Sequence, residues 1–125
     1  MAIDSLMKSH FPTVLLLADR RSSQTARLLK ASGYRVMTTF TPDHAVAICV
    51  NNPVDAVILD QQHFIETEGW SVAKSLKMLR QTVCIILVMR GRMIGHNLPA
   101  GVDAVVRENE SQALLNSLKQ LLRNS

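Results

Sequence analysis

The chain has 125 residues, of which 47% are hydrophobic and only 4% aromatic. A chain of this length suits one domain and can bury roughly two-thirds of the surface that its unfolded form exposes, so we expect one core of aliphatic side chains. The net charge of +4 does not by itself indicate nucleic-acid binding, because the few aromatic residues offer little for bases to stack on.

Nothing in the sequence indicates a membrane span or a signal peptide. The longest apolar run, residues 83–89, is far too short to cross a bilayer. Cys49 and Cys84 lie in apolar segments without metal-ligand spacing, which favours buried free thiols in a reducing cytosol over a disulfide. We therefore expect a cytoplasmic domain over residues 11–125, preceded by a flexible extension at residues 1–10.

Short β-rich runs alternate with helical patterns along the chain. The runs cover residues 13–18, 34–40, 55–59, 83–89 and 104–106. The first, third and fourth runs are nearly all apolar, as expected for central parallel strands that helices cover on both faces, whereas the second alternates and suggests an edge. The sequence therefore predicts one α/β domain, a doubly wound five-stranded parallel sheet with helices on both faces.

The first two helices have recognisable start signals. Ser22 or Ser23 can cap a helix that continues to Ala31. Thr41 followed by proline predicts the start of a helix that runs to about Val50.

Two later helices are predicted from apolar stripes. Thr67 can cap a helix whose apolar face holds four residues, and Asn109 with Gln112 resembles a capping box before a leucine-rich helix. Glycines and a proline crowd residues 90–101, so we expect the fourth crossover helix to be short or irregular, near residues 93–98. The apolar face of the Thr67 helix comprises Val72, Ala73, Leu76 and Leu79.

Two aspartates end predicted strands. Asp19 follows the first strand and Asp60 the third, and the carboxyl ends of parallel strands meet at one edge of a sheet. Two carboxylates there could share a divalent cation or act as acid and nucleophile. Each could equally cap the loop that follows it, because Asp is common at such turns.

Four segments taken together resemble the receiver domain of bacterial response regulators. They are Val14-Leu-Leu-Leu-Ala-Asp-Arg20, Asp55-Ala-Val-Ile-Leu-Asp60, Ile85-Ile-Leu-Val-Met89 and Gly101-Val-Asp-Ala-Val-Val106. The likeness runs from about residue 13 to residue 122 and implies a flavodoxin-like fold.

The resemblance implies roles for the strand-end acids. Asp60 matches the aspartate that accepts a phosphoryl group from a histidine kinase. Mg²⁺ would be held by Asp19, by Asp60 and by the backbone carbonyl of Gln62, while Ala18 stands where the family has a second acid. Magnesium is therefore the one cofactor implied, and the missing acid weakens the site.

Three further positions depart from the family pattern. Met89 replaces a Thr or Ser that binds the phosphoryl group, Glu108 replaces a Lys that contacts it, and Val105 replaces an aromatic residue that senses it. Phosphoryl transfer depends on neutralising charge on the moving oxygens, so these changes disfavour a conventional phosphoryl switch.

Arginines also follow the strands. Arg20, Arg90 and Arg107 should all approach the carboxyl edge, and one guanidinium could pair with Asp60 or Asp19 in place of the cation. The alternative is that these long side chains point into water.

The leading interpretation is a divergent receiver in two-component phosphorelay signalling that works mainly through protein contacts and is not an enzyme. Its partner would be a histidine kinase or an output protein, and a homodimer is a further possibility. In a second interpretation, Asp60 is slowly phosphorylated by a phosphodonor. In a third, the domain senses small anions or nucleotides. A membrane is not expected as a partner, nor is nucleic acid.

Overall fold

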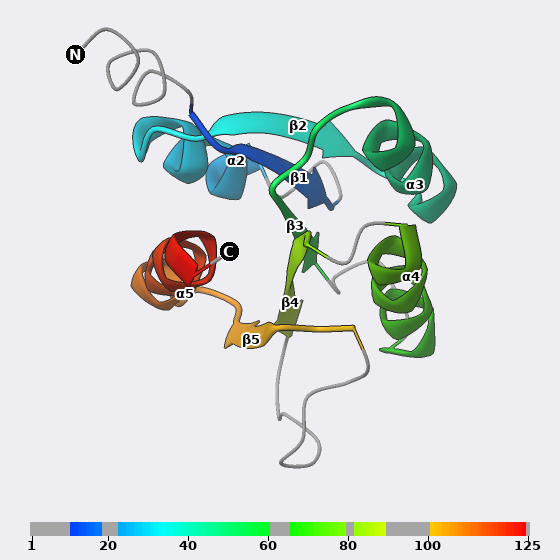
Figure 1. The fold of residues 1–125 in the computed structure, drawn as a ribbon. Coiled ribbons are helices and arrows are strands. Elements are labelled where there is room, and N and C mark those ends of the chain that lie inside the picture. The colour runs from blue at the N-terminus through cyan, green and yellow to red at the C-terminus, as the bar shows by residue number, and fades with distance from the viewer. Residues whose placement is uncertain (1–10, 19–22, 61–65, 80–81, 90–100, 125) are drawn as a thin grey trace, which may run out of the picture.

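The chain forms alternating strands and helices in a computed structural model that describes residues 11–18, 23–60, 66–79, 82–89 and 101–124 (Figure 1). The elements in chain order are β1 (Thr13–Leu17), α2 (Ser23–Ala31), β2 (Arg35–Thr39), α3 (Pro42–Asn51), β3 (Ala56–Asp60), α4 (Glu66–Leu79), β4 (Cys84–Met89), β5 (Ala104–Arg107) and α5 (Ser111–Asn124). Within these residues, no helix is long and apolar enough to cross a membrane.

The five strands make one parallel sheet in the order β2-β1-β3-β4-β5. The three strands predicted to be central, β1, β3 and β4, are central, and β2 lies at an edge as its alternating pattern predicted. The strand order reverses between β1 and β3, and the carboxyl ends of strands at such a reversal are where open α/β sheets place their sites.

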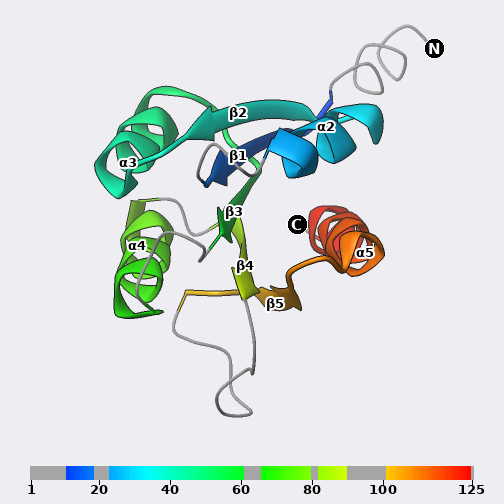
Figure 2. The same cartoon turned by 180° about the vertical axis from the view of Figure 1, so that it is seen from behind.

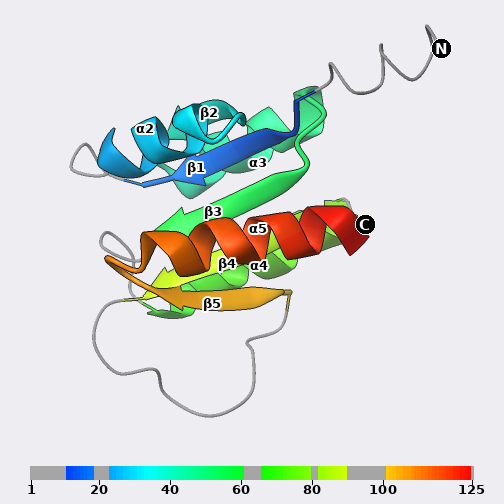
Figure 3. The same cartoon turned by 90° about the vertical axis from the view of Figure 1, so that its left-hand side faces the viewer.

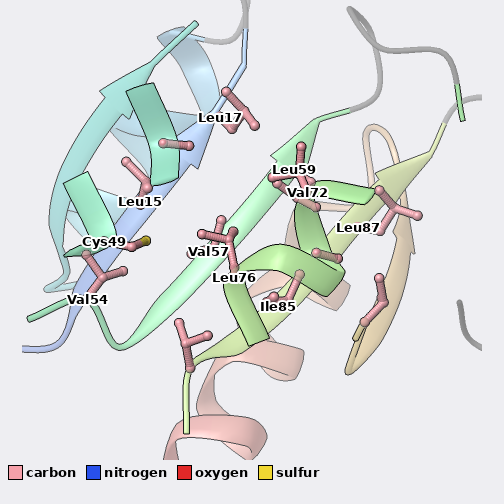
Figure 4. Packing of buried hydrophobic residues seen from close by; sticks show 14 of the residues in the cluster. Leu15, Leu17, Cys49, Val54, Val57, Leu59, Val72, Leu76, Ile85 and Leu87 are labelled. Atoms are coloured by element: carbon pink, nitrogen blue, oxygen red, sulfur yellow. The ribbon is translucent and has the colours of Figure 1, made fainter. Parts of the chain in front are cut away.

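Helices cover both faces of the sheet. α3 and α4 lie on one face and α2 and α5 on the other, as the views from front and back show (Figures 1 and 2). Successive side chains of each strand point to opposite faces of the sheet. Leu15 and Val57 therefore pack under α3 and α4 (Figure 4), and Leu16 and Ile58 pack under α2 and α5. The predicted doubly wound architecture is confirmed.

The two cysteines are free and buried, as predicted. Cys49 belongs to the core cluster under α3 and α4, and Cys84 belongs to the cluster on the opposite face of the sheet. Burial, and next the nearby Asp103 carboxylate, raise the pKa of the Cys84 thiol. A protonated buried thiol is a poor nucleophile, so Cys84 acts as a small apolar residue of the core.

The start of α3 follows its sequence signal. Thr41 caps the helix, because its hydroxyl oxygen accepts a hydrogen bond of 3.2 Å from the backbone N–H of His44, and Pro42 occupies the first turn. The signal proposed for α4 was wrong: this helix begins at Glu66, so Thr67 lies inside it. Its buried stripe is also shorter than predicted, since Leu79 is 50% exposed.

The predicted capping box before α5 is also wrong. Asn109 has φ +68°, the left-handed conformation, whereas an N-cap residue is extended. The helix begins two residues later at Ser111, and the side-chain amide of Gln112 donates to Asn116 in the next turn at 3.0 Å. Asn tolerates the left-handed region, so it serves the turn between β5 and α5.

The segment that precedes β5, residues 101–103, packs against α4. Gly101 has φ +86°, and a Cβ there would lie 3.0 Å from the backbone carbon and oxygen of Ala73. The Asp103 carboxylate forms an ion pair with the Lys77 ammonium at 2.8 Å. It also accepts a hydrogen bond of 2.8 Å from the backbone N–H of Ile85. These contacts hold the last turns of α4 against the amino ends of β4 and β5.

Two predictions lie outside the described residues. These are the flexible extension at residues 1–10 and the short helix near residues 93–98.

Candidate functional site

Asp60 lies where the sequence predicted, at the carboxyl end of a central strand. It is the last residue of β3 and pairs with Val88 of β4. Its side chain is only 5% exposed, and it is the one charged residue buried among those that the structure describes. A buried carboxylate is costly unless its charge is compensated, so Asp60 is not a solvated loop cap.

The neighbouring strands place apolar side chains at the same edge. Ala18 follows β1, is 4% exposed and donates its backbone N–H to the carbonyl of Thr39 at 3.0 Å. Met89 ends β4, is 6% exposed and packs into the core cluster under α3 and α4. Neither side chain can supply a carboxylate or a hydroxyl group to the edge.

The end of β5 brings charged side chains to this edge. Arg107 is exposed and Glu108 half-buried, and the backbone N–H of Glu108 donates to the carbonyl of Met89 at 2.9 Å. Val105, two residues earlier, is half-buried and packs against the cluster under α3 and α4, away from Asp60.

A pocket of about 110 Å³ opens between the first turns of α2 and α5 at the carboxyl edge. Asp60 and Glu108 both line it, together with Glu110 and Arg107. Its other lining residues are Leu16, Gln24, Thr25, Leu28, Ile58, Val88, Val106, Asn109, Ser111 and Leu114. The phosphoacceptor position predicted from the sequence therefore shares one pocket with Glu108, the residue that follows β5.

Several predicted site residues lie outside the described residues. They are Asp19, Arg20, Gln62 and Arg90. The pairing of Asp19 with Asp60 and the part of Gln62 in a magnesium site therefore stay predictions. Among the residues described, no group of three or more His, Cys, Asp or Glu is placed to hold a metal ion.

Solved structures with this fold identify the chain's family. No family model matches the chain. No curated protein matches it either. A CheY-like receiver domain protein from Methanospirillum hungatei has a TM-score of 0.80 at 21% identity, covering 92% of this chain and 96% of that one. The receiver domain of the TMAO respiratory system response regulator TorR is 30% identical with a TM-score of 0.74, covering 90% of this chain and 98% of that one.

The chain belongs to the response regulator receiver domains. A third similar structure, response regulator TrrA from Thermotoga maritima in complex with Mg²⁺–BeF, has a TM-score of 0.77 at 22% identity, covering 89% of this chain and 99% of that one. The receiver fold confirms the resemblance seen in the sequence. It also gives Asp60 its expected place, at the carboxyl end of the third strand.

Sequence reasoning about this receiver domain missed part of the pocket. Gln24 and Thr25 of α2, and Asn109 and Ser111 before and within α5, line it beside Asp60. The one available signal was that each segment directly follows a strand of the predicted sheet, because first turns after strands gather at the carboxyl edge. Which of these turns face each other depends on helix packing, which the sequence pattern does not specify.

Proposed function

We propose that this receiver domain acts in two-component phosphorelay signalling in the cytoplasm mainly through contacts with partner proteins, and not as a conventional phosphoryl switch. The partner is a histidine kinase or an output protein, as is usual for receiver domains. The two buried free thiols fit a reducing compartment.

The observation that carries this proposal is that Glu108 and Asp60 line one pocket. A phosphoryl group on Asp60 would bring further negative charge into a pocket that Glu108 and Glu110 also line. Like charges repel more strongly at the low dielectric of a partly buried site than in water. Transfer of a phosphoryl group needs that charge neutralised, and a lysine at position 108 would have helped to do so.

Met89 supports the same conclusion. Its thioether is buried in the core on the α3–α4 side of the sheet. A hydroxyl at the end of this strand would donate a hydrogen bond to a phosphoryl oxygen, and a methionine has no such donor.

Magnesium is usually held by one or two carboxylates together with water and phosphate oxygens. Asp60 supplies one such carboxylate and Asp19 is predicted to supply another, while Ala18 stands where the family has a further acid. We propose that a guanidinium, from Arg20, Arg90 or Arg107, compensates Asp60 in place of the cation. Arg107 lines the same pocket as Asp60.

The alternative is that Asp60 is the phosphoacceptor of a working, slow receiver. Its place at the end of β3 favours this alternative, and so does the Mg²⁺–BeF complex of the similar TrrA structure. Intact-mass spectrometry after incubation with acetyl phosphate and Mg²⁺ separates the two functions, with Asp60→Ala as the control. We expect no stable mass gain in the wild-type chain. A phosphoryl-sized gain that disappears in Asp60→Ala would establish the alternative.

A further inference from the structure

The layer formed by α2 and α5 carries cations and no carboxylates. Arg27 and Lys30 of α2 and Lys119 and Arg123 of α5 are all exposed, and neither helix contains Asp or Glu. We call these four residues the basic face. The opposite layer is mixed, because α3 contains an aspartate and α4 contains two glutamates and two lysines.

The four cations gather on one half of their layer. α2 and α5 contact each other and run in the same direction, from the carboxyl edge of the sheet toward its amino edge (Figure 3). Arg27 and Lys30 are one turn apart from the middle of α2 onward, and Lys119 and Arg123 are one turn apart in the second half of α5. The basic face therefore lies away from the edge that holds Asp60.

Folding alone does not account for this arrangement. A cation in the last turn of a helix is stabilised by the helix dipole, which explains Lys30 and Arg123. Arg27 and Lys119 lie a turn earlier, where that effect has faded. Like charges one turn apart destabilise a helix slightly, so the pairs lower stability and call for another explanation.

Apolar surface lies beside the cations. Leu115, Leu121 and Leu122 of α5 and Ala26 of α2 pack against the core and remain only partly buried. A nucleic-acid backbone presents phosphates and no apolar surface to cover such side chains, and aromatic groups on which bases stack are few in this chain. An amphipathic helix with acidic flanks presents both an apolar stripe and carboxylates.

We propose that the basic face binds an acidic amphipathic helix of a partner protein. The apolar stripe of that helix covers the half-buried leucines, and its carboxylates pair with the four cations. A second copy of this chain does not fit by two-fold pairing, since that would set four cations against four. The inference rests on the proposed role in protein contacts and names the partner's chemistry, but it does not depend on what happens at Asp60.

The test uses two synthetic peptides of about 20 residues, long enough to hold a helix in water. Both carry leucine at i, i+3, i+4 and i+7; one has glutamate on the flanks and the other lysine. Binding to the full chain is followed by NMR chemical shifts and by calorimetry at low salt and at about 0.5 M salt. Duplex DNA serves as the competing probe.

We expect only the glutamate peptide to bind, with shifts confined to α2 and α5 and weaker binding at high salt. Lys119→Glu should weaken it about fivefold, as expected when exposed pairs worth up to about 1 kcal/mol are lost. The matched control Lys74→Glu reverses an exposed charge on α4, in the other layer, and should change affinity less than twofold.

Equal binding of both peptides, tighter binding of the duplex, or equal effects of Lys119→Glu and Lys74→Glu would each overturn the inference. These outcomes are separate from the acetyl phosphate experiment. A mass gain on Asp60 contradicts the proposed function and leaves the peptide result as it stands, and failure of the peptide leaves the mass result as it stands.

Discussion

Asp60 and Glu108 line one pocket at the carboxyl edge, and we expect these two residues to determine what chemistry that edge supports. The two residues line this one pocket although Asp60 ends β3 and Glu108 follows β5. A carboxylate in place of a lysine exchanges attraction for repulsion toward a phosphoryl group. A single substitution at position 108 should therefore change the reactivity of Asp60 more than a substitution elsewhere on the rim.

Glu108→Lys should restore part of the phosphoryl chemistry. An ammonium at this position stabilises charge on the transferring oxygens, so we expect acetyl phosphate to give Glu108→Lys a mass gain on Asp60 that the wild type does not show. Intact-mass spectrometry measures this gain. The control is Glu110→Lys, the same charge change at an exposed residue of the same pocket. Equal gains in the two variants would refute the role given to Glu108.

Cys84 gives a pH dependence of stability. Burial, and next Asp103 and Asp55, raise the pKa of this thiol in the folded state against the opposing effect of Lys77. The folded chain then holds the proton more tightly than the unfolded chain. The stabilisation is complete below the ordinary thiol pKa of 9.0 and is lost as the pH rises through the folded value.

Urea denaturation between neutral pH and about pH 10 tests this effect. The free energy of unfolding should fall as the pH rises above the ordinary thiol pKa. In Cys84→Val, this free energy should fall less steeply. Tyr34, whose pKa burial also raises, leaves a residual slope in both proteins. Identical slopes in the two proteins would show that the Cys84 thiol does not contribute.

At the scale of elements, the Lys77–Asp103 pair joins α4 to the amino ends of β4 and β5. Asp103 also accepts the backbone N–H of Ile85, a fully buried residue. Losing that acceptor leaves a buried donor unsatisfied, which costs about 1–3 kcal/mol, whereas losing a partly exposed ion pair costs up to about 1 kcal/mol.

Asp103→Ala should therefore lower the free energy of unfolding by about 2–3 kcal/mol, and Lys77→Met by about 1 kcal/mol. Urea denaturation of both variants gives the comparison. An Asp103→Ala protein as stable as Lys77→Met, which also loses the hydrogen bond from Lys77 to the Val83 carbonyl, would mean that the buried amide of Ile85 adds nothing to the contribution of Asp103.

Two glycines with similar backbone angles make a matched pair. Gly101 and Gly33 both have positive φ, +86° and +98°, but a Cβ at Gly101 meets the backbone of Ala73 at 3.0 Å, while one at Gly33 meets nothing within 4 Å. Gly33→Ala should cost about 1–2 kcal/mol from backbone strain alone. Gly101→Ala should cost about 2 kcal/mol more, since helix and strand must also separate. Equal losses of thermal stability would exclude the close approach.

Strand patterns predicted the elements better than cap signals did. Continuous apolar runs located β1, β3 and β4 to within one or two residues, because only central strands are buried on both faces. The start of α5 was wrong because Asn109 suits both an N-cap and a left-handed turn, and only the packing of β5 against α5 selects one. Leu79 was assigned to the core because periodicity does not show where the sheet ends.

At the scale of the whole molecule, the strand order puts Asp60 at the carboxyl edge of the sheet. No local sequence signal specifies that position. Alternation of strands and helices predicted the sheet, and the sheet predicted that the ends of its strands share one edge. The position of Asp60 was therefore predictable, while the pocket was not, because its walls come from two helices whose approach depends on side-chain packing. The predicted contribution of Asp19 lies outside the described residues.

The two helical layers divide the molecule by charge as well as by position. One layer is free of carboxylates within its helices, and the pocket that holds Asp60 lies at the carboxyl edge of that same layer. A receiver with a conventional switch relays a change at its aspartate to a distant surface. We expect this domain to present its surfaces without such a change.

The measurement that tests this most directly is NMR of the domain titrated with Mg²⁺ and beryllofluoride, a mimic of the phosphoryl group. We predict no saturable binding and no shifts in β4, β5 or α5 beyond those that Asp60→Ala also shows. Saturable binding in the micromolar range, with shifts that spread from Asp60 to β5 and α5 and vanish in Asp60→Ala, would contradict the account.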